Sequence, residues 1–490
     1  MIVRRLPMLG VCVVALAGII AVDGSETEPV SAVFAEPLAP WMPAVPVAGE
    51  LTSTWFCPGM PAAGTDDTSG QLVLANAGSA PMQARVTFLA GPGEAAQQAI
   101  SVPPYERSTI DVVASPTSPY VSAVVEIDGG GGLVEQRATT DAGTSVAPCT
   151  TQTSGEWYLA EGFTTEDSNE QLVLTNPSDG PARVEIGFAT SAGSRQPSEL
   201  QGYPIPPRSV RVIDMDSIAA RDEAEVAVKV DVSRGTVVVG RAQVYDGGGR
   251  LGYSMTLASP SLRSQWWFAN GDRGSGVTER FSIYNPTEND VSLTPVYLGI
   301  SEATEVLVDQ INVPARQVVT YSSDDVEGLP DGRHAVVFAT DDFSESVVVE
   351  RAVTRTIDDI PTTSVLAGGT SRREDAFIAN TWTLAIGPGE PTEDGLIVYN
   401  TTSADATVTL QAVTVDGPVN VPGFEAVVLA AGAILPLPLT DPSVVDAQLV
   451  VRSTQPVFVE RSLPREPGAQ GRSASWAVPV AVPVATAAGA

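Results

Sequence analysis

Apolar and polar residues alternate along much of the chain with the two-residue period of a β-strand. Residues 183–188, 210–214 and 226–232 place apolar side chains on every second position. Such alternation predicts strands with one buried face. Turn-forming residues separate the runs, for example at 176–177 and 246–248. Seven or eight short strands in roughly 105 residues, with no long amphipathic helix, predict an all-β fold of β-sandwiches, either immunoglobulin-like or jelly-roll-like.

The strand pattern returns four times, which indicates a tandem repeat. Each copy has an aromatic strand, then an apolar strand ending in asparagine, and later a valine-rich strand carrying an arginine. The asparagine-to-arginine separations are 61, 65, 66 and 61 residues. We therefore predict four tandem β-sandwich modules at residues 50–150, 151–260, 261–370 and 371–466. The repeated residues are Asn76, Asn176, Asn285 and Asn400, with Arg137, Arg241, Arg351 and Arg461.

These repeated residues have structural interpretations. Asparagine tolerates left-handed geometry and caps turns through its amide, so we expect each one in a turn. The arginine follows Gln136, Glu350 or Glu460 in three modules. It is expected to form a cross-strand ion pair or to pack through its aliphatic stem. The aromatic strands are expected to anchor each core, and we place them at Trp55, Trp157, Trp266 and Phe377.

The N-terminus has the pattern of an export segment. Arg4 and Arg5 precede an apolar run, residues 6–22, and acidic residues follow it. We expect residues 1–25 to be a retained signal anchor, with a cleaved signal peptide and secretion as the alternative. The body would then be extracytoplasmic, anchored in the cytoplasmic membrane by this N-terminal helix.

Two other segments fall outside the predicted modules. The proline-rich residues 26–49 are expected to form a stalk between the membrane and the body. Residues 467–490, rich in alanine, valine and proline, are expected to be a disordered tail.

Two cysteines remain once Cys12 of the apolar run is set aside. Cys57 and Cys149 bracket module one, and an exported compartment would allow a disulfide between them. We expect that disulfide, with two free thiols as the alternative. A Cys-His nucleophile is implausible because module one has no histidine.

The chain is strongly acidic, with a formal net charge of −31 from 58 acidic and 27 basic side chains. The charge is spread over all four modules, so it is expected to keep the surface soluble. Such a surface argues against nucleic acid and anionic lipid as partners. Membrane contact is expected through the N-terminal segment only.

Few residues could carry chemistry, and we assign no catalytic, cofactor or metal residue. His334 has no accompanying nucleophile motif and is expected to face solvent or cap a strand. Trp382, placed in a loop of module four, is a possible glycan contact by ring stacking, although burial is favoured. Acidic groups in predicted loops match no calcium-loop spacing and are expected to be solvated. They are Asp66 with Asp67, Glu166 with Asp167 and Glu170, Asp324 with Asp325, Asp341 with Asp342, and Glu393 with Asp394.

One motif carries a family resemblance. The sequence WYLAEG at 157–162, followed by LVLTNP at 172–177, is similar to a motif of bacterial cell-surface repeats. Over residues 1–466 the chain resembles an actinobacterial family of unknown function, with one membrane segment before an extracytoplasmic all-β region. The motif is degenerate where Ala77 and Thr401 replace the proline. The resemblance implies an envelope location and no assigned activity.

The sequence leads to two main hypotheses about function. We expect a non-enzymatic envelope protein, a membrane-tethered row of four modules that acts as a scaffold or protein-interaction surface. The alternative is a carbohydrate-binding protein of the cell wall, and a hydrolase is the least favoured class. The expected partner is therefore an envelope protein or cell-wall glycan.

Overall fold

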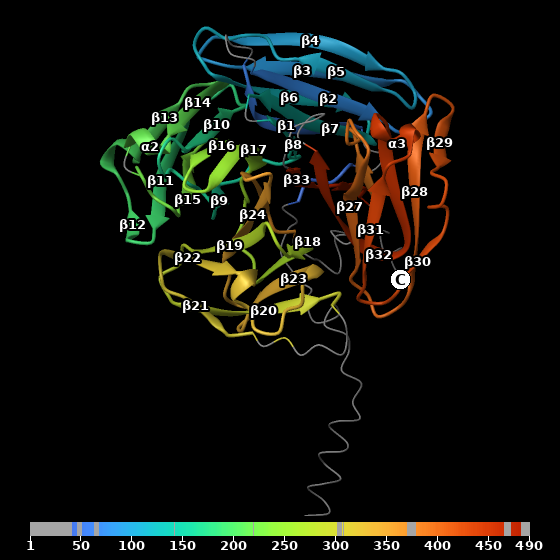
Figure 1. The fold of residues 1–490 in the computed structure, drawn as a ribbon. Helices are drawn as coiled ribbons and strands as arrows, with labels where there is room; N and C mark the ends of the chain where they lie inside the picture. The colour runs from blue at the N-terminus through green and yellow to red at the C-terminus, as the bar shows by residue number, and fades with distance from the viewer. Residues whose placement is uncertain are drawn as a thin grey trace, which may run out of the picture.

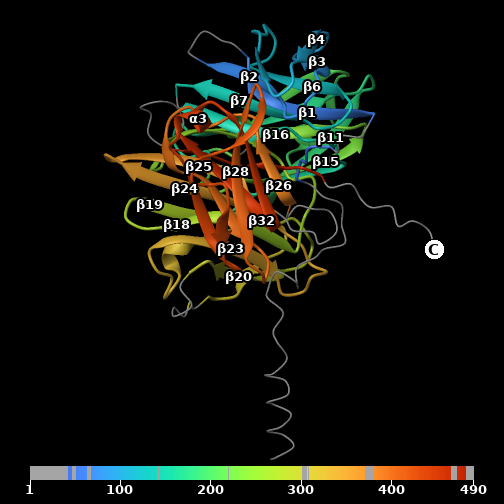
Figure 2. The ribbon, with the colours of Figure 1, turned by 90° about the vertical axis from the view of Figure 1, so that its right-hand side faces the viewer.

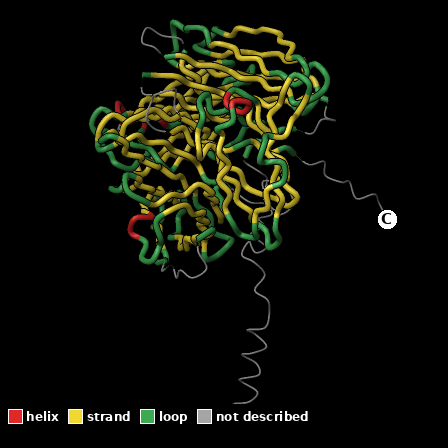
Figure 3. The backbone as a smooth tube through the Cα atoms, turned by 45° about the vertical axis from the view of Figure 1, so that its right-hand side comes forward, coloured by secondary structure: helices red, strands yellow, loops and turns green. Residues whose placement is uncertain are grey.

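The computed structural model describes residues 42–46, 51–62, 68–141, 143–218, 220–300, 306, 308–369, 379–464 and 472–481. The predicted signal segment and residues 26–41 and 47–49 of the predicted stalk lie outside this range. Within it, no helix has the length and apolar character needed to cross a membrane. Strands dominate the described chain, and helices are confined to short turns (Figure 3). The predicted all-β class is confirmed.

Module one shows the sandwich common to all four copies. Two four-stranded sheets face each other, and we call them outer and inner by their place in the molecule. The outer sheet has the order β1 (Thr52–Pro61), β6 (Tyr120–Asp128), β3 (Met82–Leu89), β4 (Ala95–Val102). The inner sheet has the order β5 (Arg107–Asp111), β2 (Ser69–Asn76), β7 (Gly132–Thr140), β8 (Gly143–Pro148).

Modules two and three repeat this order with variations at the outer edge. In module two the outer sheet is β9 (Glu156–Leu159), β15 (Ala227–Arg234), β11 (Ala182–Thr190), with β12 (Gly193–Arg195) and β13 (Tyr203–Ile205) at its edge. Its inner sheet is β14 (Ser209–Asp214), β10 (Asn169–Asn176), β16 (Val238–Gly247), β17 (Arg250–Leu257). In module three the outer sheet is β18 (Gln265–Arg273), β23 (Gly332–Thr340), β20 (Val291–Leu298), β21 (Ile311–Val313). Its inner sheet is β22 (Gln317–Ser322), β19 (Val277–Asn285), β24 (Val348–Ile357), β25 (Ile360–Ala367).

Module four joins its two sheets through one long strand, β32 (Gln448–Pro464), which pairs in both. The outer sheet adds β26 (Ala379–Leu384), β28 (Ala406–Thr414), β29 (Gly417–Asn420), β30 (Val427–Leu429) and β34 (Val478–Pro479). The inner sheet adds β31 (Ile434–Leu439), β27 (Thr392–Asn400) and β33 (Arg472–Trp476).

The four modules close into a ring, so the expected row is wrong. Each inner sheet points its last strand, β8, β17, β25 or β33, toward the centre (Figures 1 and 2). There β8 contacts β17, β17 contacts β25, β25 contacts β33, and β33 contacts β8. Leu251 of β17 also pairs in parallel with Thr362 of β25. The molecule is therefore a closed ring with the last module packed against the first.

Both chain ends take part in this closure, which corrects two predicted boundaries. Residues 472–481 were expected to be disordered, but β33 pairs with β32 and β34 pairs with β26. Val45, from the predicted stalk, receives a hydrogen bond from Ala481 and donates one to Pro479, at 2.9 and 2.8 Å. Trp476 and Val478 are buried. Their apolar side chains reach the core, which outweighs the turn-forming effect of the nearby prolines.

Candidate functional site

The four repeated asparagines lie in equivalent turns. Asn176 is buried, and its amide nitrogen donates to the carbonyl oxygens of Gly180, Ile205 and Pro206 at 2.8, 3.2 and 3.0 Å. Its side-chain oxygen accepts the N–H of Ser178 at 3.0 Å. The side chain thus saturates a turn and fastens a second loop to it. The same contacts recur at Asn76, Asn285 and Asn400.

Three of the repeated arginines join neighbouring modules. Arg241 of module two, fully buried, places Nη1 2.9 Å from Oε2 of Glu350 in module three. The same carboxylate oxygen accepts the backbone N–H groups of Ala160 and Glu161, at 2.8 and 2.7 Å. Burial alone would lower the pKa of Arg241, but the carboxylates of Glu350 and Glu170 raise it above its ordinary value. The guanidinium is therefore charged, and the junction is a saturated buried ion pair.

The next two junctions repeat this arrangement. Arg351 of module three pairs with Glu460 of module four, whose carboxylate accepts the N–H groups of Ala269 and Asn270 at 2.9 and 3.1 Å. Arg461 then pairs with Glu135 of module one at 2.9 Å and closes the ring. In each pair the glutamate belongs to the next module of the ring, so the arginine finds its charged partner outside its own module. Adjacent residues in a strand point to opposite faces, so Arg351 cannot reach its neighbour Glu350.

Arg137 and the cysteines lie in module one. Arg137, on β7, is half-buried opposite Gln71 of β2. The disulfide between Cys57 and Cys149 is confirmed. It ties the first strand of the module to the residue that follows β8, and so holds the outer sheet to the inner strand at the ring centre.

Trp382 is not an exposed aromatic, so the possible glycan contact there is wrong and the favoured burial is what the structure has. Its side chain is 0% exposed on β26, and its indole N–H donates to the carbonyl of Val457 at 2.9 Å. Trp157 and Trp266 make the equivalent bonds to Val237 and Val347. Trp382 is thus the core tryptophan of module four. Phe377, where the aromatic strand of this module was expected, lies outside the described residues. Trp382 precedes the repeated asparagine by 18 residues, against 19 for Trp157 and Trp266, a spacing that identifies it from sequence.

His334 is buried, not solvent-facing. Its Nε2 lies 2.8 Å from Oε2 of Glu279, which also accepts the hydroxyl of Ser323 at 2.6 Å. Burial alone would raise the pKa of Glu279, but His334, Arg351 and Ser323 together hold it below its usual value. The histidine therefore serves as an internal partner of a buried carboxylate.

Glu170 occupies the same repeat position as Glu279, six residues before the asparagine, but in a different setting. It is fully buried, and its Oε1 lies 4.0 Å from Nη1 of Arg241. The outer-sheet partner of Trp157 is Val230, and that of Trp266 is Phe338. Counting back four residues from each partner shows that Val226 is the module-two equivalent of His334. Burial raises the pKa of Glu170 to about 8, against the lowering effect of Arg241. This carboxyl group is protonated at neutral pH.

Most of the other acidic groups within the described residues are exposed, as expected, and Asp394 is the exception. Asp394 is largely buried on β27, where it binds Arg333 of module three at 2.8 Å and Arg472 at 2.6 Å. Glu166, Asp324, Asp341 and Asp342 accept hydrogen bonds or form turns near the surface. Asp66 and Asp67 lie outside the described residues. In the part of the chain that the structure describes, no group of three His, Cys, Asp or Glu side chains could hold a metal ion.

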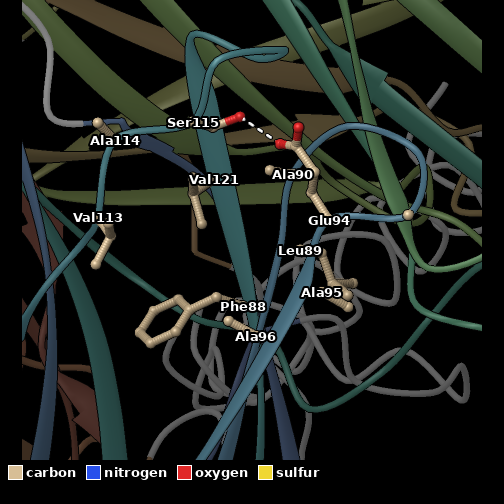
Figure 4. A pocket seen from close by; sticks show the side chains of 11 residues that line it. Phe88, Leu89, Ala90, Glu94, Ala95, Ala96, Val113, Ala114, Ser115 and Val121 are labelled. Carbon is tan, nitrogen blue, oxygen red and sulfur yellow. Dashed lines mark hydrogen bonds between the residues drawn. The ribbon is translucent and has the colours of Figure 1, made fainter.

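A pocket that sequence reasoning missed opens at one end of module one (Figure 4). It has a volume of about 240 Å³. Phe88 forms part of its floor, Ala96 of β4 lies on one side, and Val113, 79% exposed, lies on the other. Glu94 at its rim accepts the hydroxyl of Ser115 at 2.8 Å. The lining is otherwise apolar.

The pocket exists because module one lacks a helical turn that the other modules have. After the edge strand of the inner sheet, the chain forms α2 (Met215–Ile218), η3 (Ser323–Asp325) and α3 (Pro442–Val445) in modules two, three and four. Their buried residues Met215, Ser323 and Val444 cover this end of the sandwich. In module one the segment after Asp111 is an irregular loop.

The effect is visible at one repeat position. Phe188 and Tyr297 are the counterparts of Phe88 and are buried, and the Tyr297 hydroxyl lies 3.1 Å from that of Ser323 in the covering turn. Phe88 is only half-buried. Asp111 occupies the position of the capping residues Asp214 and Ser322. The sequence signal is therefore the β-branched pair Val112 and Val113 that follows it, because such residues disfavour a helical turn.

Residues 131–381 match the model of a family of unknown function, DUF5719. The chain belongs to this family. The DUF5719 match covers just over half of the chain, from β7 of module one to β26 of module four. None of the curated proteins compared with the chain matches it.

Two solved structures have low similarity to this DUF5719 protein. The crystal structure of Thermotoga maritima 1070 is 14% identical, covers 22% of this chain and 96% of its own, and gives a TM-score of 0.20. A tetra-tandem repeat in the extending region of a large adhesion protein is 12% identical, with coverages of 88% and 95% and a TM-score of 0.12. Scores this low carry no argument about this chain.

Proposed function

We propose that the protein is a non-enzymatic interaction scaffold in the cell envelope of an actinobacterium, tethered outside the cytoplasmic membrane by residues 1–25. The single observation that carries the proposal is ring closure by the buried Arg461–Glu135 pair. A closed ring holds its four modules in one fixed arrangement, which is what a platform for partners needs.

The use of polar side chains supports a scaffold. The repeated arginines 241, 351 and 461 join modules, the asparagines saturate turns, and His334 partners a buried carboxylate. The residue types that sequence reasoning considered for chemistry are thus engaged in holding the fold. The disulfide agrees with an oxidising compartment.

Glycan binding is the weaker candidate because its proposed stacking residue is buried. The six tryptophans within the described residues are Trp55, Trp157, Trp266, Trp267, Trp382 and Trp476, and each is at most 3% exposed. Stacking on a sugar ring needs an exposed aromatic face.

Localisation and partner capture test the proposal together. The full chain is produced in an actinobacterial host, and spheroplasts are treated with external protease or, separately, with a carbodiimide. The carbodiimide couples the carboxylates of this chain to the amines of its partners, which suits a chain whose single lysine is Lys229. We expect the body to sediment with membranes, to be cut by the protease, to contain oxidised Cys57 and Cys149, and to cross-link reproducibly to envelope proteins. A cytosolic chain with both thiols reduced would contradict the location. Sedimentation with purified cell wall, without protein cross-links, would favour glycan binding.

A further inference from the structure

β4 is an unprotected sheet edge. It ends the outer sheet of module one, and among the described strands only β3 pairs with it. Its eight residues, AAQQAISV, contain no charge and no proline, and most are exposed. Proteins normally shorten such edges or protect them with charges or proline, because an open edge pairs with other chains. The corresponding edge strands β12, β13, β21, β29 and β30 are only three or four residues long.

The register shows which backbone groups are open. Ala90 N–H donates to the carbonyl of Glu94 across the β3–β4 turn, at 3.2 Å. Hydrogen-bonded and non-bonded pairs alternate along an antiparallel ladder, so Ala96, Gln98 and Ile100 direct their backbone groups toward β3. The N–H and C=O groups of Ala95, Gln97, Ala99 and Ser101 consequently face outward.

The pocket lies where an added strand would place side chains. Ala96 lines it from β4, and a strand paired with the free edge would direct every second side chain to the same face as Ala96. A volume of about 240 Å³ is below the roughly 300–1,000 Å³ of small-molecule sites. It suits one bulky apolar side chain better than a free ligand.

Charge defines the remaining chemistry of the occupant. Glu94 is the one charged residue that lines the pocket, and the whole chain carries −31. A cationic side chain beside the apolar one would meet Glu94, whereas an acidic segment would be repelled.

We propose that the free edge of β4 and the adjoining pocket bind an extended, basic segment of a partner protein by antiparallel strand addition, with one bulky apolar side chain in the pocket and a lysine or arginine beside Glu94. This deepens the scaffold function proposed above and rests on it. The backbone supplies affinity and the pocket supplies selectivity, as in other cases of strand addition.

A second copy of the chain fits the site less well. Its own β4 offers mostly alanine and glutamine, and Ile100 is the one bulky apolar side chain of that strand that is not fully buried. Pairing two copies would also bring together two chains that each carry a net charge of −31, which repel each other. Self-association through β4 is nevertheless an outcome that the experiment detects.

The test uses the oxidised chain from residue 26 and a fluorescently labelled octapeptide of alternating threonine and leucine that ends in arginine. Binding of the peptide to the protein is measured by fluorescence anisotropy. We expect saturable binding. N-methylation of the threonines should abolish it, because their N–H groups face β4 in an antiparallel pair, while N-methylation of the leucines should preserve it. Replacing arginine by glutamate should weaken binding at least tenfold.

Two protein variants address the edge and the pocket separately. Ala99→Pro removes an outward N–H at a position where an edge strand tolerates proline, and Val113→Asp puts a charge at the pocket mouth. Each should weaken binding at least tenfold. Val428→Asp is the matched control, since Val428 is 69% exposed on module four, and it should bind like the wild type. Circular dichroism confirms that each variant is folded.

Several outcomes would overturn the inference. These are equal binding of both N-methylated peptides, unchanged binding by Val113→Asp, no binding of the octapeptide, or a dimer in sedimentation that Ala99→Pro converts to a monomer. If the peptide fails while envelope cross-links persist in the localisation experiment, strand addition at β4 is wrong and the scaffold proposal stands.

Discussion

Pro58 of module one lies directly against Gly240 of module two. A Cβ atom at position 240 would lie 2.9 Å from the Pro58 carbonyl oxygen. Pro58 follows Trp55 by three residues, as Ala160, Ala269 and Ala385 follow their tryptophans, and those alanines donate N–H groups to glutamates. Gly240 stands where the other modules have those glutamates. At the junction between modules one and two, Pro58 has no N–H to donate, and Gly240 provides no carboxylate to accept one. Apolar residues such as Leu89, Val173 and Met255 fill this junction instead.

This relationship predicts that Gly240→Glu destabilises the ring. The side chain would collide with Pro58, and its carboxylate would be buried without the N–H that the other junctions supply. We expect a loss of about 3 kcal/mol or more in the free energy of unfolding, measured by urea denaturation with tryptophan fluorescence. The double variant with Pro58→Ala restores an N–H and should recover part of the loss. A double variant no more stable than Gly240→Glu would show that the paired change is not coupled.

The buried junction pairs should be costly to break on one side only. Glu350→Ala leaves the Arg241 guanidinium buried without its carboxylate, and we expect a loss of about 3–5 kcal/mol in the free energy of unfolding. Replacing both residues together, by Glu350→Leu and Arg241→Met, should recover most of it. Glu126→Ala is the control, because its pair with Arg85 is 49% and 59% exposed and should cost at most about 1 kcal/mol. Equal effects of Glu350→Ala and Glu126→Ala would contradict the buried role.

Glu170 and Glu279 should respond to pH in opposite directions. The raised pKa of Glu170, about 8, means that its contribution to stability is complete below about pH 4.5 and is lost as pH rises through 8. Glu170→Gln removes this dependence. Relative to wild type, the variant should therefore gain a few kcal/mol in unfolding free energy between pH 5 and pH 9.

Glu279→Gln is the matched comparison. The pKa of Glu279 is lowered, so its contribution is present above about pH 4.5 and is lost as the solution becomes more acidic. This variant should be less stable than wild type at neutral pH, with the difference shrinking toward pH 3. If the unfolding free energies of the two variants, relative to wild type, changed with pH in the same direction, the proposed difference between the environments of Glu170 and Glu279 would be wrong.

Local features of this chain could be predicted from its sequence, whereas contacts between modules could not. The role of Asn176 was predictable because it depends on the chemistry of a local turn. The disulfide of Cys57 was predictable because the two cysteines lie at the two ends of one module. The Arg241–Glu350 and Arg351–Glu460 pairs each span 109 residues. Repetition alone does not distinguish a row from a ring, since both repeat the same module. The pocket escaped notice because it arises from a turn that module one lacks.

The disulfide is expected to contribute strongly to module one. It closes a loop of 92 residues, and the chain-entropy model assigns roughly 4–5 kcal/mol to a loop of that size. Cys57→Ser with Cys149→Ser should lower the unfolding free energy by an amount of that order. Urea denaturation of the oxidised wild type, the reduced wild type and the double variant would check this, and the last two should agree. A double variant as stable as the oxidised protein would contradict a structural role.

Ring closure itself depends on residues 472–481, which leads to a truncation experiment. A chain that ends at residue 464 lacks β33, whose Ser475 accepts a hydrogen bond from Arg461 Nε at 2.7 Å. It also lacks Trp476 and Val478, which are buried between the modules. We expect the Arg461–Glu135 junction to open, the radius of gyration from small-angle scattering to increase, and module four to unfold at lower urea concentration than the rest. A chain ending at residue 481 keeps every contact described here and should match the full chain. If the chain ending at 464 keeps the compact radius and unfolds in one step with the control, the C-terminal strands do not close the ring.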